Sequence, residues 1–140
     1  RVLVLTKMVS HYDGLLHDIR ELDPEGADRA IALRGTGSSK ERAAALADLR
    51  SGGRDFSVLL GTFSLLSTGV DVPSLDTLVI AGDLKSDVLT EQSAGRILRL
   101  FEGKQDPLVV DVNDVGNPIL KRQAQARRAF YIQQGWKINK

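Results

Sequence analysis

Three polar residues in the second half of the chain have a spacing suited to holding a phosphate chain. Gln92, Arg96 and Arg99 stand at i, i+4 and i+7, so a helix would present their side chains on one face. Two adjacent guanidinium groups can each donate paired hydrogen bonds to a multiply charged anion. Arginines at this spacing also occur on helices that merely face water. The pattern alone therefore leaves both interpretations open.

The residues between these three predict an amphipathic helix over 88–101. Its apolar members recur at i, i+3, i+4 and i+7 and form a stripe nearly opposite the arginines: Ala94, Ile97, Leu98 and Phe101. One face of this helix is therefore suited to packing on a core, and the other presents two cations and an amide.

Short runs rich in valine and leucine alternate with segments of helical period along the whole chain. The predicted strands are 2–5, 30–33, 56–60, 78–81 and 108–112, with a short edge strand at 136–138. Helices are predicted between the first and second, second and third, and fourth and fifth strands and after the fifth, and a loop with glycine and proline between the third and fourth. This order predicts an α/β fold with an open, mainly parallel sheet and helices on both faces. Ligands of such sheets bind beyond the carboxyl ends of the strands.

Local sequence signals mark where the predicted helices begin and end. The first covers 12–22. Ser38 or Ser39 is expected to cap the second, which Gly52 ends. Pro118 suits the first turn of the last, which ends near Gly135. The apolar side of the second helix is predicted to consist of Ala43, Leu46, Ala47 and Leu49.

The composition is that of one globular domain: 140 residues, 42% hydrophobic and 26% charged, with a net charge of +1. The chain has no cysteine and two histidines, which excludes a disulfide framework and a thiolate or histidine-rich metal site. We expect Asp111 and Asp114 to serve helix capping, so no metal site is predicted. After Asn117 the charged residues are all basic, which suits either a polyanion or a solvated helix.

No apolar stretch approaches the length of a membrane span, and the N-terminus lacks a signal-peptide pattern. We therefore expect a cytoplasmic protein with no membrane partner. The chain begins at Arg1 inside an apolar run, so we also expect residues 1–140 to be one domain of a longer protein.

A loop after the third predicted strand carries groups that suit a phosphate backbone. Hydroxyl and backbone N–H groups around Thr62 and Gly69 could meet a phosphodiester. Asp71 lies in an apolar turn, where its carboxylate needs a partner, either a ribose hydroxyl or an N–H group of the turn.

A second loop, 33–39, places Gly35 before a helix whose first turn holds Arg42. Glycines, hydroxyls and a helix N-terminus suit a phosphate. The sequence G-x-x-x-x-G-K-[ST] does not occur, so this chain cannot hold a nucleotide in the manner of a P-loop.

The motifs, taken in order, resemble motifs IV, V and VI of the second RecA-like domain of superfamily 2 helicases. They are Thr6-Lys7, the loop from Thr62 to Pro73, and Gln92-x-x-Gly95-Arg96-x-x-Arg99. Lys85-Ser86, Gly103-Lys104 and Arg128-x-x-Tyr131-x-x-x-Gly135-Trp136 are most similar to the XPB-like and phage UvsW-like DNA helicases. Ser93 stands where DEAD-box enzymes carry an arginine, which argues against that branch.

The resemblance implies roles at the nucleotide. Arg99 would be the arginine finger for ATP bound on an N-terminal RecA-like domain outside this chain, with Arg96 beside it and Gln92 linking this face to other motifs. Gly69 and Asp71 would contribute to ATP binding. That other domain would hold most of the contacts to ATP and Mg²⁺, so the isolated chain should be inactive.

The resemblance also implies a nucleic-acid site formed by Thr6, Lys7, Gly35, Arg42 and Thr62, which would contact the phosphate backbone. DNA is the expected strand, ahead of RNA. Two rival interpretations are a non-catalytic nucleic-acid or protein docking module with a RecA-like fold, and a small flavodoxin-like ligand domain. Neither rival needs aligned motor arginines.

Overall fold

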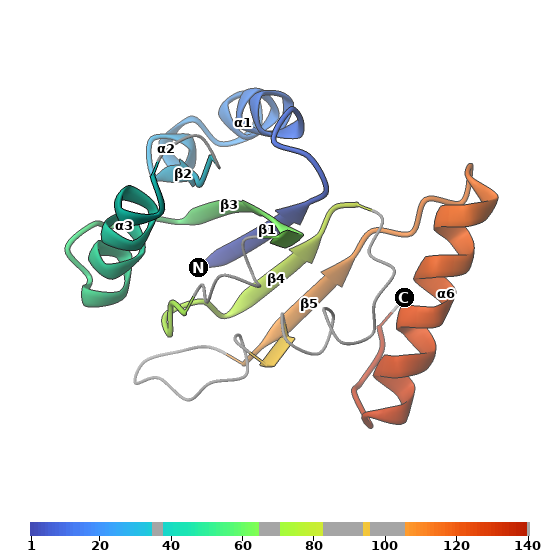
Figure 1. Cartoon of the computed structure of the whole chain (residues 1–140). Coiled ribbons are helices and arrows are strands. Elements are labelled where there is room, and N and C mark those ends of the chain that lie inside the picture. The colour runs from blue at the N-terminus through green and yellow to red at the C-terminus, as the bar shows by residue number, and fades with distance from the viewer. Residues whose placement is uncertain (35–37, 65–70, 83–93, 96–105, 140) are drawn as a thin grey trace.

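The strands of the computed structural model are parallel and lie in one sheet (Figure 1). The structure describes residues 1–34, 38–64, 71–82, 94–95 and 106–139, with Ser39 and Arg42 described by their backbone alone. Within these residues the sheet has the order β2-β3-β1-β4-β5. The strands are β1 (Val2–Thr6), β2 (Ala30–Ala32), β3 (Val58–Thr62), β4 (Thr77–Ile80) and β5 (Leu108–Asp111). The predicted α/β fold with a parallel sheet is confirmed.

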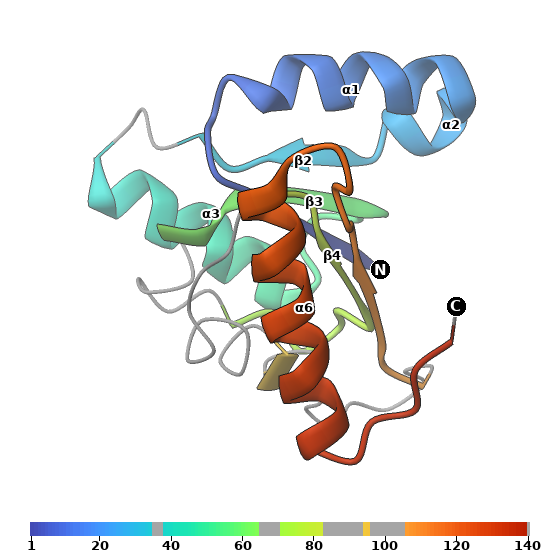
Figure 2. The same ribbon diagram turned by 90° about the vertical axis from the view of Figure 1, so that its right-hand side faces the viewer.

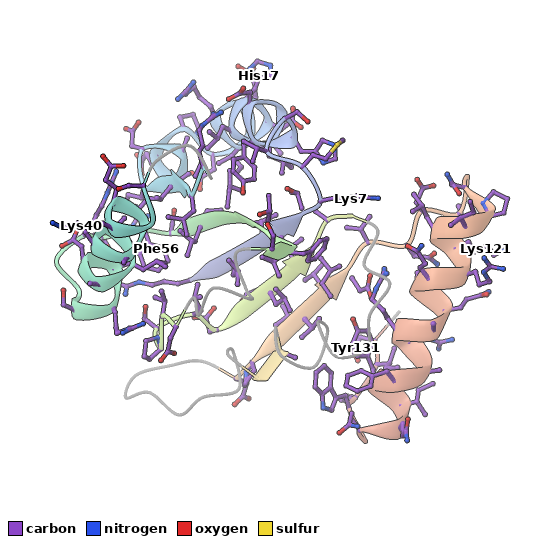
Figure 3. All side chains as sticks on the ribbon, in the orientation of Figure 1. Lys7, His17, Lys40, Phe56, Lys121 and Tyr131 are labelled. Carbon is purple, nitrogen blue, oxygen red and sulfur yellow. The ribbon has the colours of Figure 1, made fainter. Side chains whose placement is uncertain are left out.

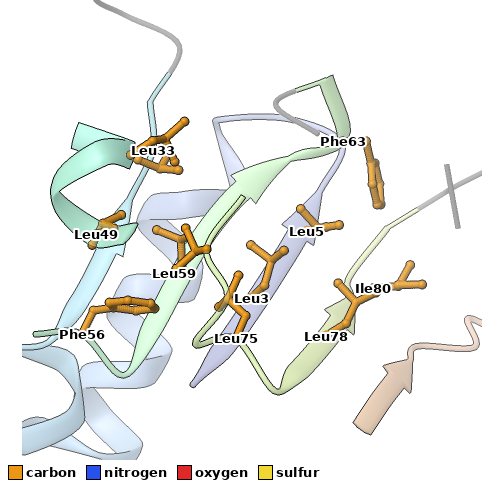
Figure 4. Packing of buried hydrophobic residues seen from close by; sticks show 12 residues of the cluster. Leu3, Leu5, Leu33, Leu49, Phe56, Leu59, Phe63, Leu75, Leu78 and Ile80 are labelled. Atoms are coloured by element: carbon orange, nitrogen blue, oxygen red, sulfur yellow. The ribbon is translucent and has the colours of Figure 1, made fainter. Parts of the chain in front are cut away.

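Helices cover both faces of the sheet, as predicted. Along β1 the side chains alternate between the two faces. On one face, Val4 packs with Tyr12 of α1 (His11–Leu22). On the other, Leu3 belongs to a larger cluster that includes Leu49 of α3 (Ser39–Ser51) and is drawn in Figure 4.

The last helix, α6 (Pro118–Gln133), lies on the α3 side of the sheet beside β5. Asp111 of β5 is in register with Ile80 of β4, whose side chain belongs to the cluster on the α3 side. Asp111 bonds to Arg127 and Tyr131 of α6, so α6 lies on that same side. Figure 2 shows α6 running along the β5 edge.

Local sequence explains where α3 and α6 begin. Ser38 and Glu41 form a reciprocal capping box at the start of α3. Gly52 follows α3 with a φ of 76°, which favours glycine. Asn117 caps α6, and Pro118 occupies its first turn. The cap predicted for α3 and the place predicted for Pro118 are therefore confirmed, with Ser38 rather than Ser39 as the cap. The cap of α6, Asn117, was not predicted.

Several boundaries differ from the prediction. A short helix, α2 (Pro24–Ala27), was not predicted, although Asp23 caps it and Pro24 opens it. β3 begins two residues after its predicted start, because Ser57 donates its N–H to Arg29 before the ladder to β1 begins at Val58.

One prediction about burial was wrong. Ala43 and Ala47 of α3 are exposed, so its buried side consists of Leu46 and Leu49. Among the described residues β5 pairs with β4 alone, so it forms an edge of the sheet, and its residues are exposed or half-buried.

The predicted edge strand at 136–138 was also wrong, since this segment has no strand pairing. Gly135 turns the chain with a φ of 72°. The ring of Trp136 then stacks on Tyr131, with ring centroids 5.3 Å apart and an angle of 8° between the planes. This stacking holds the chain against α6 rather than against β5.

In the part of the chain that the structure describes, no helix combines the length and the apolar character that crossing a bilayer requires.

Candidate functional site at the carboxyl end of the sheet

The carboxyl ends of three adjacent strands bring part of the predicted site together. Thr6 at the end of β1 is in register with Thr62 at the end of β3. On the other side of β1, the N–H of Ala81 donates to the carbonyl of Leu5 at 2.9 Å. The ends of β3, β1 and β4 therefore lie side by side, with Lys7 directly after β1.

The two threonine hydroxyls are engaged within the protein. Thr6 is 0% exposed, and its hydroxyl donates to the carbonyl of Met8 at 3.0 Å. The Thr62 hydroxyl lies 2.8 Å from that of Ser64, and Thr62 is buried. Both side chains hold the loops that follow their strands, so their contribution to a ligand would be the shape of those loops.

Lys7 is the exposed cation of this edge and projects away from the sheet beyond the end of β1 (Figure 3). The end of β4 lies close to Lys7. A Cβ on Gly82, just after β4, would lie 3.4 Å from the backbone nitrogen of Lys7. The end of β4 therefore lies within van der Waals reach of the Lys7 backbone.

Sequence reasoning missed a cluster at the end of β2. Tyr12 is fully buried, and its hydroxyl donates to the carbonyl of Leu33 at 3.3 Å; burial raises the pKa of this phenol. The guanidinium of Arg34 lies 5.9 Å from the centre of the Tyr12 ring and pairs with Asp13. The hydrogen bond and charge of Asp13 raise the pKa of Arg34. A basic residue directly after a strand was the signal that could have found it.

The start of α3, where a phosphate site was predicted, carries a carboxylate of its own. The Ser38 hydroxyl accepts the N–H of Glu41 at 3.2 Å, and a Glu41 carboxylate oxygen accepts the N–H of Ser38 at 2.7 Å. Glu41 thus satisfies a donor and adds a negative charge where an anion would bind. Arg42 is in this first turn by its backbone; its side chain is outside the described atoms.

Asp71 lies on the α3 side of the domain. Arg50, in the last turn of α3, donates from Nε to the carbonyl oxygen of Asp71 at 2.8 Å. The next residue, Val72, is 2% exposed and belongs to the core cluster, as does Leu75. Asp71 itself is half-buried. The backbone on its C-terminal side is therefore held by α3 and by the core.

Two residues of the predicted arginine helix are described, and both are helical. Ala94 is 1% exposed, as its place on the predicted apolar stripe requires. Gly95 is exposed, and a Cβ there would meet no atom within 4 Å. The remaining predicted site residues lie outside the described residues: Gly35, Gly69, Gln92, Arg96 and Arg99.

Asp111 at the end of β5 and Asp114 after it have structural roles other than the predicted helix capping. Asp111 binds Arg127 and Tyr131, and an Asp114 oxygen accepts the N–H of Gly116 at 2.9 Å, so neither caps α6. Among the described residues, histidine and carboxylate side chains do not gather into a group of three that could hold a metal ion.

Comparison with known proteins identifies the family to which these strand-end motifs belong. Residues 1–101 match the model of the helicase conserved C-terminal domain. The chain belongs to this helicase family. It is 41% identical over 80 residues to "Probable helicase D10" of Escherichia phage T5, a match that covers 57% of the chain. This match covers only 18% of the phage protein, so the chain corresponds to a small part of its relative.

Solved helicase structures share the fold. The DNA-bound crystal structure of the DUF1998 helicase MrfA matches 94% of the chain at 25% identity with a TM-score of 0.71, over 18% of that protein. T4 UvsW matches 95% of the chain at 19% identity with a TM-score of 0.65, over 29% of that protein. The sequence-based assignment to the C-terminal RecA-like domain of superfamily 2 helicases is confirmed.

Proposed function

We propose that this chain is the second motor domain of an ATP-dependent DNA helicase or translocase. In this role Arg99 supplies the arginine finger to ATP bound on an N-terminal RecA-like domain, with Arg96 beside it and Gln92 linking the two arginines to neighbouring motifs. The burial of Ala94 next to the exposed Gly95 carries the proposal. In the helix predicted over 88–101, this orientation would direct the face opposite Ala94, which bears the arginines, away from the core.

Gly69 and Asp71 are this chain's proposed contribution to the nucleotide site. The bond from Arg50 to the Asp71 carbonyl and the burial of Val72 support a fixed position for the Asp71 carboxylate, as a contact to a ribose hydroxyl requires. Mg²⁺ held mainly by the N-terminal domain would neutralise phosphate charge. We expect the isolated chain to lack ATPase activity, because its sequence has no P-loop.

Lys7, Gly35 and Arg42 are proposed to contact the phosphate backbone of the bound strand. Lys7 is supported by its exposure at the edge where β3, β1 and β4 end. Thr6 and Thr62 are assigned to the same site, and we propose that they shape the loops that bind the strand, because their hydroxyls are engaged internally. DNA is the proposed strand, because the crystal structure of the similar helicase MrfA is of a DNA-bound form.

The decisive experiment measures ATP hydrolysis by the full-length protein that carries this domain, with and without single-stranded DNA. Changing Arg99 to Ala should lower kcat about a thousandfold, since an arginine finger contributes that much to phosphoryl transfer. The matched control, Arg122→Ala, removes an exposed arginine of α6 and should leave kcat unchanged.

The rival function, a docking module without a motor role, makes the opposite prediction. It predicts no hydrolysis stimulated by either DNA or RNA in the full-length protein, or hydrolysis that Arg99→Ala leaves unaltered. Either result would refute the arginine-finger assignment. Stimulation by RNA but not by DNA would replace DNA with RNA as the strand and leave the motor role in place.

A further inference from the structure

A groove lies along the edge of β5 that has no neighbouring strand among the described residues. Its volume is about 1000 Å³, and its described lining residues come from β5 and the residues beside it, from α6, from the C-terminal segment 136–139 and from Ala94. Every residue from Pro107 to Asp111 lines it. Since neighbouring side chains of a strand point to opposite faces, five consecutive lining residues mean that the backbone edge of β5 itself faces the groove.

The hydrogen bonds of β5 show which backbone groups face outward. The N–H of Leu108 donates to the carbonyl of Asp76, just before β4, at 2.9 Å. The N–H of Val112 donates to the carbonyl of Ile80 in β4 at 3.2 Å. By alternation, the N–H and C=O groups of Val109 and Asp111 point away from β4. Among the described residues no backbone group bonds to them. Such an edge is a template for one more strand.

The opposite wall also has unpaired backbone. Within the described residues, Lys137, Ile138 and Asn139 make no backbone hydrogen bond after the turn at Gly135, and all three line the groove. The groove therefore has free backbone donors and acceptors on two sides.

The charge of the groove is positive. Arg128 of α6 and Lys137 line it, and both are exposed. The carboxylate of Asp111 also lines it, but the buried Arg127 binds both of its oxygens, so this negative charge is neutralised.

We propose that this groove receives an extended, acidic segment of a partner protein, which adds to β5 as a further strand. Side chains of the added strand would alternate between the two faces of the sheet. Those on the α6 side would meet Arg128, which favours carboxylates. Those on the other side would lie beside Leu108 and Val110, which are 51% and 41% exposed, and this favours β-branched apolar residues.

The backbone geometry favours a peptide over a nucleic acid, because only a peptide offers donors and acceptors at the two-residue period of the β5 edge. The charge disfavours a second copy of this chain, because pairing two β5 edges would bring the arginine and lysine of each copy together.

The test uses a synthetic peptide with the core Val-Glu-Val-Glu-Val-Glu, and the same peptide with Lys in place of Glu. Binding is followed through the fluorescence of Trp136, the single tryptophan of the chain, which lines the groove. Amide hydrogen exchange at Val109 and Asp111 identifies the edge. We expect the acidic peptide to bind, the lysine peptide not to bind, and exchange at both amides to slow by about tenfold or more.

Charge variants sharpen the test. Arg128→Glu should weaken binding of the acidic peptide by about fivefold or more and allow the lysine peptide to bind. Arg122→Glu is the matched control, because Arg122 is an exposed arginine of α6 that is not among the groove residues. Circular dichroism confirms that each variant is folded.

Three outcomes would overturn the proposal. The first is failure of the acidic peptide to bind, or an equal loss in Arg122→Glu. The second is that Val109 and Asp111 are already protected in the free chain, which would mean that residues 137–139 close on β5 in solution. The third is that single-stranded DNA or a second copy of the chain, detected by sedimentation, displaces the peptide from the edge.

Discussion

Arg127 of α6 binds Asp111 of β5 through two parallel hydrogen bonds. Nε lies 2.8 Å from Oδ2, and Nη2 lies 2.6 Å from Oδ1. Burial lowers the pKa of Arg127, but its bonds to Asp111 outweigh burial and raise it. The hydroxyl of Tyr131 donates to Asp111 Oδ2 at 2.8 Å. These bonds join α6 to the edge of the sheet.

Removing one partner of this pair should destabilise the fold strongly. Arg127 is 3% exposed, so Arg127→Met would leave the Asp111 carboxylate partly buried without its cation. We expect the free energy of unfolding to fall by about 3 kcal/mol, measured by urea denaturation.

Arg128→Met is the matched control for that experiment. Arg128 is the next residue of α6 and is exposed, so its loss should change stability by less than about 0.5 kcal/mol. Equal destabilisation by the two variants would contradict a specific role for the Arg127–Asp111 pair.

The two tyrosines should titrate above the ordinary range. Burial raises the pKa of Tyr12, and burial together with the Asp111 carboxylate raises that of Tyr131. The chain has two tyrosines in all, so tyrosinate absorbance reports on these residues alone. In the folded chain we expect little tyrosinate at pH 10, where an unperturbed phenol is half ionised.

The raised values also link pH to stability. Above about pH 10 the unfolded chain loses the phenol protons before the folded chain does. Stability from these groups is therefore complete below that pH and is lost as the pH rises toward the folded values. In the variant Tyr131→Phe, the free energy of unfolding should fall less steeply as the pH rises above about 10. Half-ionisation of either tyrosine near pH 10 in the folded chain would contradict the raised pKa values.

The sequence contained enough information to predict the parallel sheet and several residues at the carboxyl ends of its strands. Apolar runs specify buried parallel strands, so β1 and β4 were predicted to within one residue. The carboxyl ends of parallel strands share one edge of the sheet, but the sequence did not predict that β1 and β3 are neighbours with Thr6 and Thr62 in register. The cap Ser38 and the place of Pro118 in the first turn of α6 depend on neighbours in the chain and were predicted, whereas the cap Asn117 was not.

Features that depend on contacts between residues far apart in the chain could not be predicted from the sequence. Trp136 has the β propensity of a strand residue, yet its stacking on Tyr131 decides the path of the chain. Arg34 directly follows a predicted strand, but its pairing depends on Tyr12 and Asp13 of α1, which are distant in the sequence. The engagement of the Thr6 hydroxyl by Met8 likewise follows from the β1–α1 loop rather than from residue type.

Lys7 provides the sharpest test of the proposed nucleic-acid site. Its cation is exposed where three strands end, so it should replace about one counterion when it contacts a phosphate. Lys7→Ala should weaken binding of single-stranded DNA similarly for all base sequences and reduce the slope of log K against log salt concentration by about 1. Binding is measured by fluorescence anisotropy at several salt concentrations. The control is Arg20→Ala, which removes an exposed cation from the last turn of α1, at the far end of that helix from the loop that holds Lys7. An unchanged slope in Lys7→Ala, or an equal change in the control, would show that Lys7 does not contact the strand, because neutralising one phosphate must alter the number of counterions released.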